Sequence, residues 1–433
     1  MKRIFLILAL LLSTPAWADY WTKHGTFTLS GGATPYDQAV TGLPGQPKAI
    51  KFWTNAQTTT GFTASSQIAL GFTVGASSSY CISNWSSDAA ATSVNYRMSH
   101  AAAICLIDSG GLLNLAFNLK TFDSTGFTVT VTTAYSSGQI IHYFAWGGSD
   151  ITGAAVNQYQ LGASTGNTGY TGVGFKPDYL YMMSILSTTA SIETTHAQIA
   201  VGSASSTSAQ WTIAATARSG QTSSANINAQ SRQITSAVLA GVDIYDNTDF
   251  SDTLYSLDSD GFTLNQTVAP NNGQYYFWTL SLKGGNYKVG AWNKNTAGAP
   301  VQDTVSGLGF TPTGVDLASW NFASSTSLHS NYQFSIGAGT STDGTQQGSS
   351  WQEEQDNQIN TVADRDETTK ALTLATAAST TDAAADLYSL ASGQFIMNWT
   401  TNNGTASEIL YAAFGSSGGA PPGPGIIWHH CTP

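Results

Sequence analysis

Charged residues are scarce in this chain of 433 residues. Lys, Arg, Asp and Glu together make up 9% of it, against about 25% in an average soluble protein. The formal net charge is -11 and the sequence pI is about 4.8. Nucleic acids and anionic membrane surfaces both attract proteins through clusters of basic residues. We therefore expect neither as a partner.

Sequence motifs that mark enzymes are also missing. There is no phosphate-binding loop, no dinucleotide-binding glycine pattern, no His-Glu-x-x-His, and no Gly-x-Ser-x-Gly elbow between a strand and a helix. The seven histidines are scattered and do not recur at equivalent places. The sequence predicts a protein that is not an enzyme.

Cysteine is rare, with three residues in all. Cys81 and Cys105 are 24 residues apart and could form a disulfide in an oxidising compartment, or both could be small core residues. Cys431 is then left over, beside His429 and His430, and could be a free thiol or an intermolecular link.

Long hydrophobic runs are absent after the N-terminus. Residues 1–18 combine a basic start, a short apolar run and the small-x-small sequence Ala16-Trp17-Ala18, which predicts a cleaved signal peptide and no transmembrane anchor. We therefore expect a secreted, extracellular or periplasmic protein, or one on a virion or cell surface. The chain ends in a Pro/Gly-rich tail, 420–433.

Three short phrases occur three times in the same order. Pro47, Pro177 and Pro312 each precede an apolar run, and they are 130 and 135 residues apart. A Gly-Phe phrase follows at Gly126 and Gly261, with a weaker copy at Gly393 in which Gln394 looks like an insertion. An aromatic phrase then closes each copy. Such recurrence indicates a triplicated unit.

The fold class that follows is all-β: three tandem antiparallel β-sandwich repeats, of jelly-roll or lectin-like type. Short alternating runs with turn residues at regular spacing are typical of sandwiches. In the first copy we expect a leading strand within 26–29 and then about seven more, within 48–53, 68–75, 80–85, 94–97, 112–119, 127–132 and 140–146. The expected boundaries are 19–148, 149–285 and 286–419.

Two groups of carboxylates could carry chemistry. Asp243, Asp246 and Asp249 stand at three-residue intervals, with Asp252 next, and could bind Ca²⁺ through oxygen ligands, although a solvated acidic loop explains them as well. Glu353 with Asp366 or Glu367 could form a glycosidase pair if folding brought them together. An exposed acidic loop is the simpler interpretation of the second group.

Trp85, Trp211 and Trp351 precede polar loops and take similar places in the three copies. A flat indole ring beside Asn or Asp suits the face of a sugar, so these three are the candidate ligand-binding residues. Their alternative role is in the hydrophobic core.

The proline, Gly-Phe-Thr and aromatic phrases resemble the β-sandwich modules of phage virions and tail-fibre-like proteins. The same strand order looks like that of H-type lectins. This resemblance implies a structural or attachment protein that self-associates or joins other surface or virion proteins. The alternative is a secreted carbohydrate-binding protein that recognises cell-surface glycans.

Overall fold

The computed structural model describes residues 20–88, 91–134, 138–222, 229–325, 327–356, 362–376 and 380–416. The expected signal peptide, the Pro/Gly-rich tail and Cys431 lie outside these residues. The described part contains strands and no helix, so the all-β class is confirmed. No helix in it is long and apolar enough to span a membrane.

In the described part of the chain the strands form six antiparallel sheets, three of seven strands and three of four. They occur along the chain as three sets of eleven, and we call these sets unit 1 (β1–β11), unit 2 (β12–β22) and unit 3 (β23–β33). Each unit contributes most of one large sheet and all of one small sheet, with the same strand order every time. The Pro phrases lead into β3, β14 and β25, which hold the same position in their sheets.

Unit 1 contains β1 (Trp21–Thr28), β2 (Tyr36–Thr41), β3 (Pro47–Thr54), β4 (Gly61–Ala64), β5 (Ser66–Gly75), β6 (Ser78–Ser86), β7 (Asn95–His100), β8 (Ile104–Ile107), β9 (Leu113–Asp123), β10 (Gly126–Thr133) and β11 (Ile140–Gly147). The sequence pattern indicates most of these strands but not β2, β4 and β8. All three are short, with four to six residues.

Unit 2 contains β12 (Gly153–Gln160), β13 (Gly166–Thr171), β14 (Tyr179–Ser184), β15 (Ile192–Thr195), β16 (Ala197–Ser206), β17 (Ala209–Ala217), β18 (Gln230–Ile234), β19 (Leu239–Val242), β20 (Thr248–Asp258), β21 (Gly261–Val268) and β22 (Tyr276–Lys283).

Unit 3 contains β23 (Asn286–Asn293), β24 (Val301–Ser306), β25 (Pro312–Ser319), β26 (His329–Ser330), β27 (Tyr332–Gly339), β28 (Gln347–Glu354), β29 (Val362–Glu367), β30 (Leu372–Thr376), β31 (Thr380–Ala391), β32 (Gln394–Thr401) and β33 (Glu408–Gly415).

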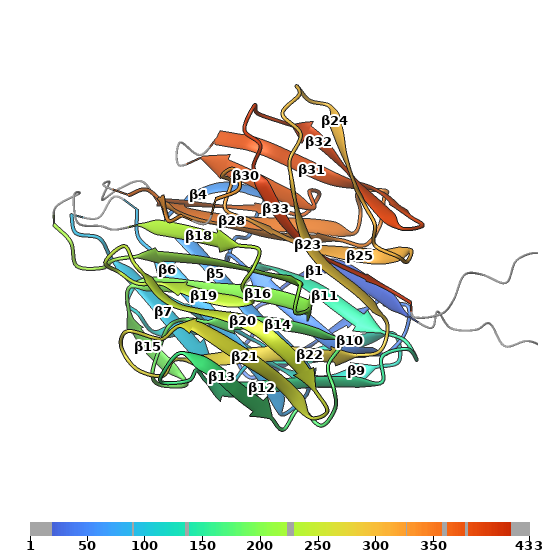
Figure 1. Cartoon of the computed structure of the whole chain (residues 1–433), viewed down its shortest axis with the longest axis horizontal. Coiled ribbons are helices and arrows are strands. Elements are labelled where there is room, and N and C mark those ends of the chain that lie inside the picture. Colours follow the sequence, from blue (N-terminus) through green and yellow to red (C-terminus); the bar gives the residue numbers. More distant parts are fainter. Residues whose placement is uncertain are drawn as a thin grey trace, which may run out of the picture.

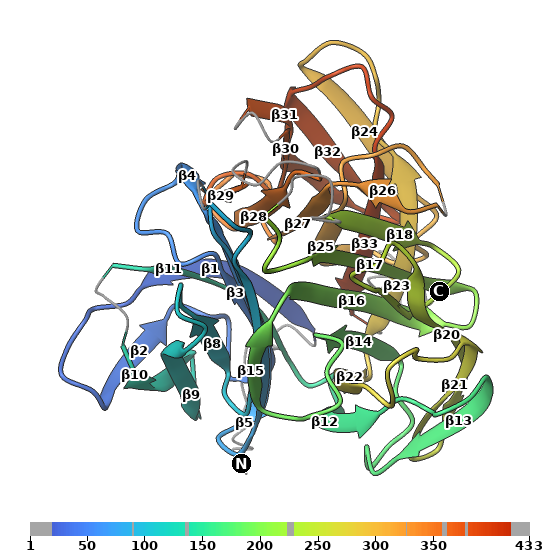
Figure 2. The same ribbon diagram turned by 90° about the vertical axis from the view of Figure 1, so that its left-hand side faces the viewer.

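Each unit has its own core between its large and its small sheet. A fourth and larger core joins the three units, because the large sheets also pack on one another through their other faces. It includes Trp53 and Phe72 of unit 1, Trp211 of unit 2, and Trp320 and Phe414 of unit 3. Figure 2 shows the three units gathered around a common centre, with the large sheets inward.

The fourth strand of each unit leaves its own sheets and joins the edge of a neighbour's large sheet. β4 of unit 1 pairs with β29 of unit 3, β15 of unit 2 pairs with β7 of unit 1, and β26 of unit 3 pairs with β18 of unit 2. The exchange is cyclic, since every unit gives one strand and receives one. Figure 1 shows β15 beside β7, and Figure 2 shows β4 beside β29 and β26 beside β18. The three units are therefore bound by main-chain hydrogen bonds as well as by the shared core.

Three equivalent residues meet where β3, β14 and β25 face one another. Lys51, Tyr181 and Asp316 each lie four residues after the proline of their phrase. The Lys51 ammonium donates to the Asp316 carboxylate at 2.5 Å and lies 4.9 Å from the centre of the Tyr181 ring, and all three side chains are buried. The central position thus holds a cation, an aromatic ring and an anion that complement one another.

Gly71, Gly202 and Gly337 occupy one equivalent position in the three large sheets. A Cβ atom at these glycines would lie only 2.1, 1.7 and 2.0 Å from the carbonyl oxygens of Ala103, Val238 and Ala371, respectively. Each of these carbonyls belongs to the residue directly before an edge strand of the small sheet, which is β8, β19 or β30. Glycine is required here because the two sheets of each unit approach too closely for any side chain.

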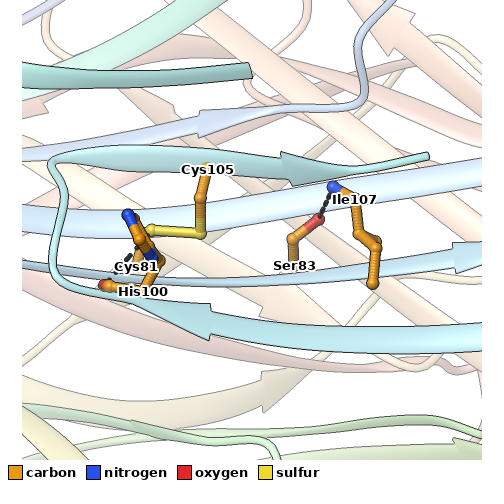
Figure 3. The surroundings of a disulfide bond; sticks show 5 residues. All are labelled: Cys81, Ser83, His100, Cys105 and Ile107. Atoms are coloured by element: carbon orange, nitrogen blue, oxygen red, sulfur yellow. Dashed lines mark hydrogen bonds between the residues drawn. A yellow bond between two sulfur atoms is a disulfide. The ribbon is translucent and has the colours of Figure 1, made fainter. Parts of the chain in front are cut away.

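Cys81 on β6 and Cys105 on β8 form a disulfide that ties the large sheet of unit 1 to its small sheet (Figure 3). The register places Thr212 of unit 2 and Ser349 of unit 3 at the position of Cys81. In unit 3 the corresponding link is a hydrogen bond between the hydroxyls of Ser349 and Thr373, 2.9 Å long. Of the two interpretations of the cysteines, the structure has the disulfide.

Gln394 corrects one detail of the repeat pattern. It pairs with Ala391 and Ser306, as Gly126 pairs with Asp123 and Thr41. It is therefore a substitution of the repeated glycine and not an insertion.

Candidate functional site

The exchanged strands are positioned by a repeated backbone device. β3, β14 and β25 each end in a residue with a hydroxyl, which is Thr54, Ser184 or Ser319. This hydroxyl donates to a carbonyl of the neighbouring strand and accepts from the N–H two residues on. The residue bearing that N–H has a positive φ of 54° to 65°, and a second positive-φ residue follows the exchanged strand at Ser65, His196 and Asn331. These two bends carry the chain out to the neighbour's edge and back.

A polar cleft of about 550 Å³ opens where β4 meets unit 3, and we call it cleft 1. Its lining includes Asn55, Gln57, Trp85 and Asp108 of unit 1 and Asp364 of unit 3. A cleft of about 350 Å³, cleft 2, opens at the equivalent junction, where β15 meets unit 1. Its lining includes Ser187, His196, Asp243 and Tyr275 of unit 2 and Arg97 of unit 1.

The two clefts correspond residue by residue. Asp364 lies opposite Thr63 of β4, and Arg97 lies opposite Thr194 of β15, so the donated strand covers an acid in one junction and a base in the other. At the third junction the corresponding partner is Ser231, opposite His329 of β26. The His329 ring stacks on Phe322 there, with ring centres 3.9 Å apart. The three junctions share a backbone plan and differ in their side chains.

Asp364 is the most constrained group of cleft 1. Its carboxyl accepts hydrogen bonds from the Gln57 amide (2.5 Å), from the Thr63 hydroxyl and from the Gln67 N–H (2.9 Å). Burial nevertheless raises the pKa of Asp364 to about 8, because the ionised form loses its hydration. The cleft therefore presents a carboxyl that can remain protonated at neutral pH.

Cleft 2 contains a cation, which the described lining of cleft 1 lacks. Arg97 donates to the carbonyls of Thr195 and Leu186 at 3.1 and 3.4 Å, and burial lowers its pKa to about 10, which leaves it cationic. His196 accepts from the Ser219 N–H at 2.9 Å, and burial, with Arg97 and Arg218 nearby, lowers its pKa to about 4. The cleft thus combines the Arg97 cation with the carboxyl groups of Asp243 and Asp249.

The three candidate tryptophans do not share one position. Trp211 and Trp351 are fully buried, and Trp211 donates to the Tyr411 carbonyl of unit 3 at 2.9 Å, so neither ring has a free face. Trp85 is half-buried and lines cleft 1. The register places Trp85 opposite Gln67, and the residues opposite the equivalent Gln198 and Gln333 are Thr216 and Glu353. The spacing had suggested an equivalence that the pairing corrects.

Asp243, Asp246 and Asp249 are not gathered into a metal centre, and the described residues hold no cluster of three or more such ligands. Asp243 accepts from the Tyr245 and Asn247 N–H groups at 2.7 and 2.9 Å, which closes a turn. Asp249 accepts from the Asn271 N–H at 2.9 Å and from the Tyr275 hydroxyl at 2.8 Å. Two of the three carboxylates are thus occupied in shaping the wall of cleft 2.

Glu353 and Asp366 lie on paired strands, but Glu353 is opposite Ala363 and Asp366 is opposite Ser350. Three residues of strand separate them, which is about 10 Å, and both are fully buried. Glu367 forms an ion pair with Arg365. The carboxylates are thus not arranged around a described cleft.

A buried chain of polar groups, which the sequence pattern does not predict, lies at the contact of units 1 and 3. His24 lies 3.3 Å from His142 between ring nitrogens, His142 lies 2.9 Å from the Asp366 carboxylate, and Ser350 donates to the same carboxylate at 3.0 Å. Trp53 stacks on His142 with ring centres 5.0 Å apart. These residue types can support acid–base chemistry, but all of them are buried, so here they join the units.

The sequence Gly162-Ala163-Ser164-Thr165-Gly166 matches the five-residue pattern of a nucleophile elbow. It lies in the connection between β12 and β13, with strands on both sides. A nucleophile elbow requires a strand followed by a helix, so the match is one of letters alone.

No protein-family model and no curated protein matches the chain. Among solved structures, fructofuranosidase from Schwanniomyces occidentalis complexed with fructose aligns over 89% of this chain and 99% of its own, with 7% identity and a TM-score of 0.11. A TM-score this low supports no inference about this chain, so we argue its function from the geometry alone.

Proposed function

We propose that this chain is an exported, non-enzymatic structural or attachment protein built from three tandem β-sandwich repeats. The observation that supports the proposal best is the cyclic strand exchange. The exchange closes a ring of three units within one chain. No association of separate subunits is needed to form that ring. Such a ring is a rigid body suited to a virion or cell surface, and the resemblance to tail-fibre-like modules agrees with that role.

A second observation indicates where such a body would attach. Each small sheet has a β-bulge at one equivalent position, occupied by Lys120, Tyr255 and Tyr388. A bulge directs an extra side chain away from the sheet. Tyr255 and Tyr388 are 59% and 54% exposed. Tyrosine is enriched at protein interfaces relative to the rest of the surface, so these two side chains indicate a contact surface. Self-association or docking on another surface protein would cover them.

The test is the mass of the mature chain in solution. Sedimentation over a wide concentration range should show assembly, and the double variant Tyr255→Ser/Tyr388→Ser should weaken it. Lys120→Ser is the matched control, because it changes the equivalent bulge without removing an aromatic ring. A wild-type chain that remains monomeric at every concentration, and does not bind a surface protein of its source, would contradict the proposal.

A second candidate function is the binding of carbohydrate. It is favoured by the polar lining of cleft 1 and by Trp85, the one candidate tryptophan that reaches a described cleft.

A further inference from the structure

Cleft 1 contains buried polar groups that the protein itself leaves without partners. Asn55 is 2% exposed and lines the cleft, yet neither its amide nitrogen nor its amide oxygen has a hydrogen-bond partner. The Gln57 amide oxygen, 6% exposed, is also unpartnered. A buried polar atom without a partner costs about 1–3 kcal/mol. Three such atoms at one cleft indicate that something from outside completes them.

The free groups comprise one N–H donor group and two carbonyl acceptors. A hydroxyl can both donate and accept, so adjacent hydroxyls match this set better than a carboxylate or a phosphate does. The remaining lining is also built of hydroxyl and amide side chains, from Thr58, Ser65 and Asn114 among others. The cleft suits a ligand with several hydroxyl groups.

The charge of the cleft narrows the ligand further. Asp108 and Asp364 are the acidic residues of the described lining, and neither Lys nor Arg contributes to it. An anionic ligand would meet carboxyl groups without a compensating cation. Trp85 provides a flat apolar wall beside the polar groups, and one face of a pyranose ring carries C–H groups that pack on such a wall.

From these observations we infer that cleft 1 is a binding site for a neutral saccharide, with a sugar ring against Trp85 and its hydroxyls on the amides of Asn55 and Gln57. The inference deepens the second candidate function and rests on it. It extends that function by naming a site formed by two units, since Asp364 of unit 3 holds the Gln57 amide in place. The donated strand β4 is therefore part of the site as well as part of the ring.

Cleft 2 provides an internal comparison. In unit 2 the residues equivalent to Asn55 and Gln57 are Ile185, which is outside the lining of cleft 2, and Ser187, which is part of it. Arg97 takes the place of Asp364. Cleft 2 therefore lacks the two amides and carries a cation. Variants in cleft 2 should leave binding at cleft 1 unchanged.

The experiment is calorimetric titration of the full mature chain with neutral oligosaccharides of glucose, galactose, mannose and N-acetylglucosamine, and with sialylated oligosaccharides. We expect saturable binding of at least one neutral sugar. Asn55→Leu and Trp85→Ala should each weaken it about tenfold or more, which corresponds to losing one good contact. Tyr245→Ala, at cleft 2, is the matched control and should bind like the wild type. Sialylated sugars should bind more weakly than their neutral counterparts.

Thermal unfolding of every variant separates loss of the site from loss of the fold, and Trp85→Phe, which keeps a flat ring, should retain part of the affinity. Absence of saturable binding to the wild type would overturn the inference and leave the three free atoms to water. Binding that survives both Asn55→Leu and Trp85→Ala would also overturn it. Sedimentation of the same samples tests the structural role independently, so assembly without sugar binding would reject only this inference.

Discussion

Units 1 and 2 have the same strand order but carry chemically different side chains at equivalent positions. Unit 1 links its sheets with the disulfide Cys81–Cys105, whereas unit 2 has Thr212 at the first position, accepting from the Ala240 N–H at 3.1 Å. Phe117 lies in the core of unit 1, and the equivalent residue of unit 2 is Asp252, which is fully buried. The strand order is thus robust to substitutions of very different chemistry, and the backbone positions, including the repeated glycines, are what the units hold in common.

The largest effect is expected at the centre, where unit 1 has Lys51 and unit 2 has Tyr181. Lys51→Met should destabilise the chain by about 3–5 kcal/mol, because Asp316 would remain buried without its cation. Denaturant unfolding measures the loss. The double variant Lys51→Met/Asp316→Leu should recover much of it, and equal losses in the single and double variants would show that the two residues do not depend on each other.

The second-largest effect on stability is expected where the large and small sheets of a unit are linked. Cys81→Ser/Cys105→Thr gives unit 1 the hydroxyl pair of unit 3 and should cost about 3 kcal/mol, because the unfolded chain gains the freedom of a loop of 24 residues. Thr212→Val in unit 2 should cost about 1 kcal/mol, the value of one hydrogen bond. Thermal unfolding without reductant compares the two. Equal losses would mean that the disulfide adds nothing beyond local packing.

Asp252 should make the stability of unit 2 depend on pH in a way that Phe117, at the equivalent position of unit 1, does not. Neither of its carboxyl oxygens has a partner, and burial raises its pKa to about 8. Between about pH 4, its pKa when unfolded, and pH 8 the folded state keeps a proton that the unfolded state has lost. Stability from this group therefore falls as pH rises through that range, by up to about 1.4 kcal/mol per pH unit.

Asp252→Asn should remove this dependence. The variant should gain stability relative to the wild type on going from pH 6 to pH 8, by roughly 2 kcal/mol, as measured by unfolding at both pH values. Taking the difference between the two proteins cancels other titrating groups such as Glu353 and Glu354. A difference that stays constant with pH would mean that Asp252 is ionised in the folded protein.

The smallest effect on stability is expected at the bulges. Exchanging the two residues, Lys120→Tyr/Tyr255→Lys, should change the free energy of unfolding by about 0.5 kcal/mol or less, because both side chains are exposed. Assembly should respond more than stability does, since the aromatic ring moves from unit 2 to unit 1. A large loss of stability would show that the bulge residues support the sheet itself.

Much of the backbone could be predicted from local signals. Pro47, Pro177 and Pro312 mark equivalent strands because proline restricts the backbone before them, and Gly126 and Gly261 mark equivalent turns. The exchanged strands could not be predicted, because β4 has four residues and its partner lies about 300 residues away. A short strand carries little pattern, and nothing local identifies the repeat to which it will bind.

The candidate site can be predicted only in part from the sequence, because most of its residues carry no local signal. Trp85 was found because an aromatic residue beside a polar loop is a local signal. Asn55, Gln57 and Asp364 were not, because an isolated amide or acid in a polar chain does not stand out. Their significance depends on which side chains face them, and β29 of unit 3 supplies that environment. Trp211 and Trp351 were wrongly aligned with Trp85 because the connections between strands differ in length among the units.

The cyclic exchange also constrains how a gene for this protein can change. Removing one repeat would leave a neighbour's sheet with an unpaired edge and another repeat's short strand without a sheet to join. Adding a fourth would require the ring to reopen and close at a new angle. A copy number of three is therefore maintained by the backbone itself, and within that fixed number each copy has been free to diverge in its side chains.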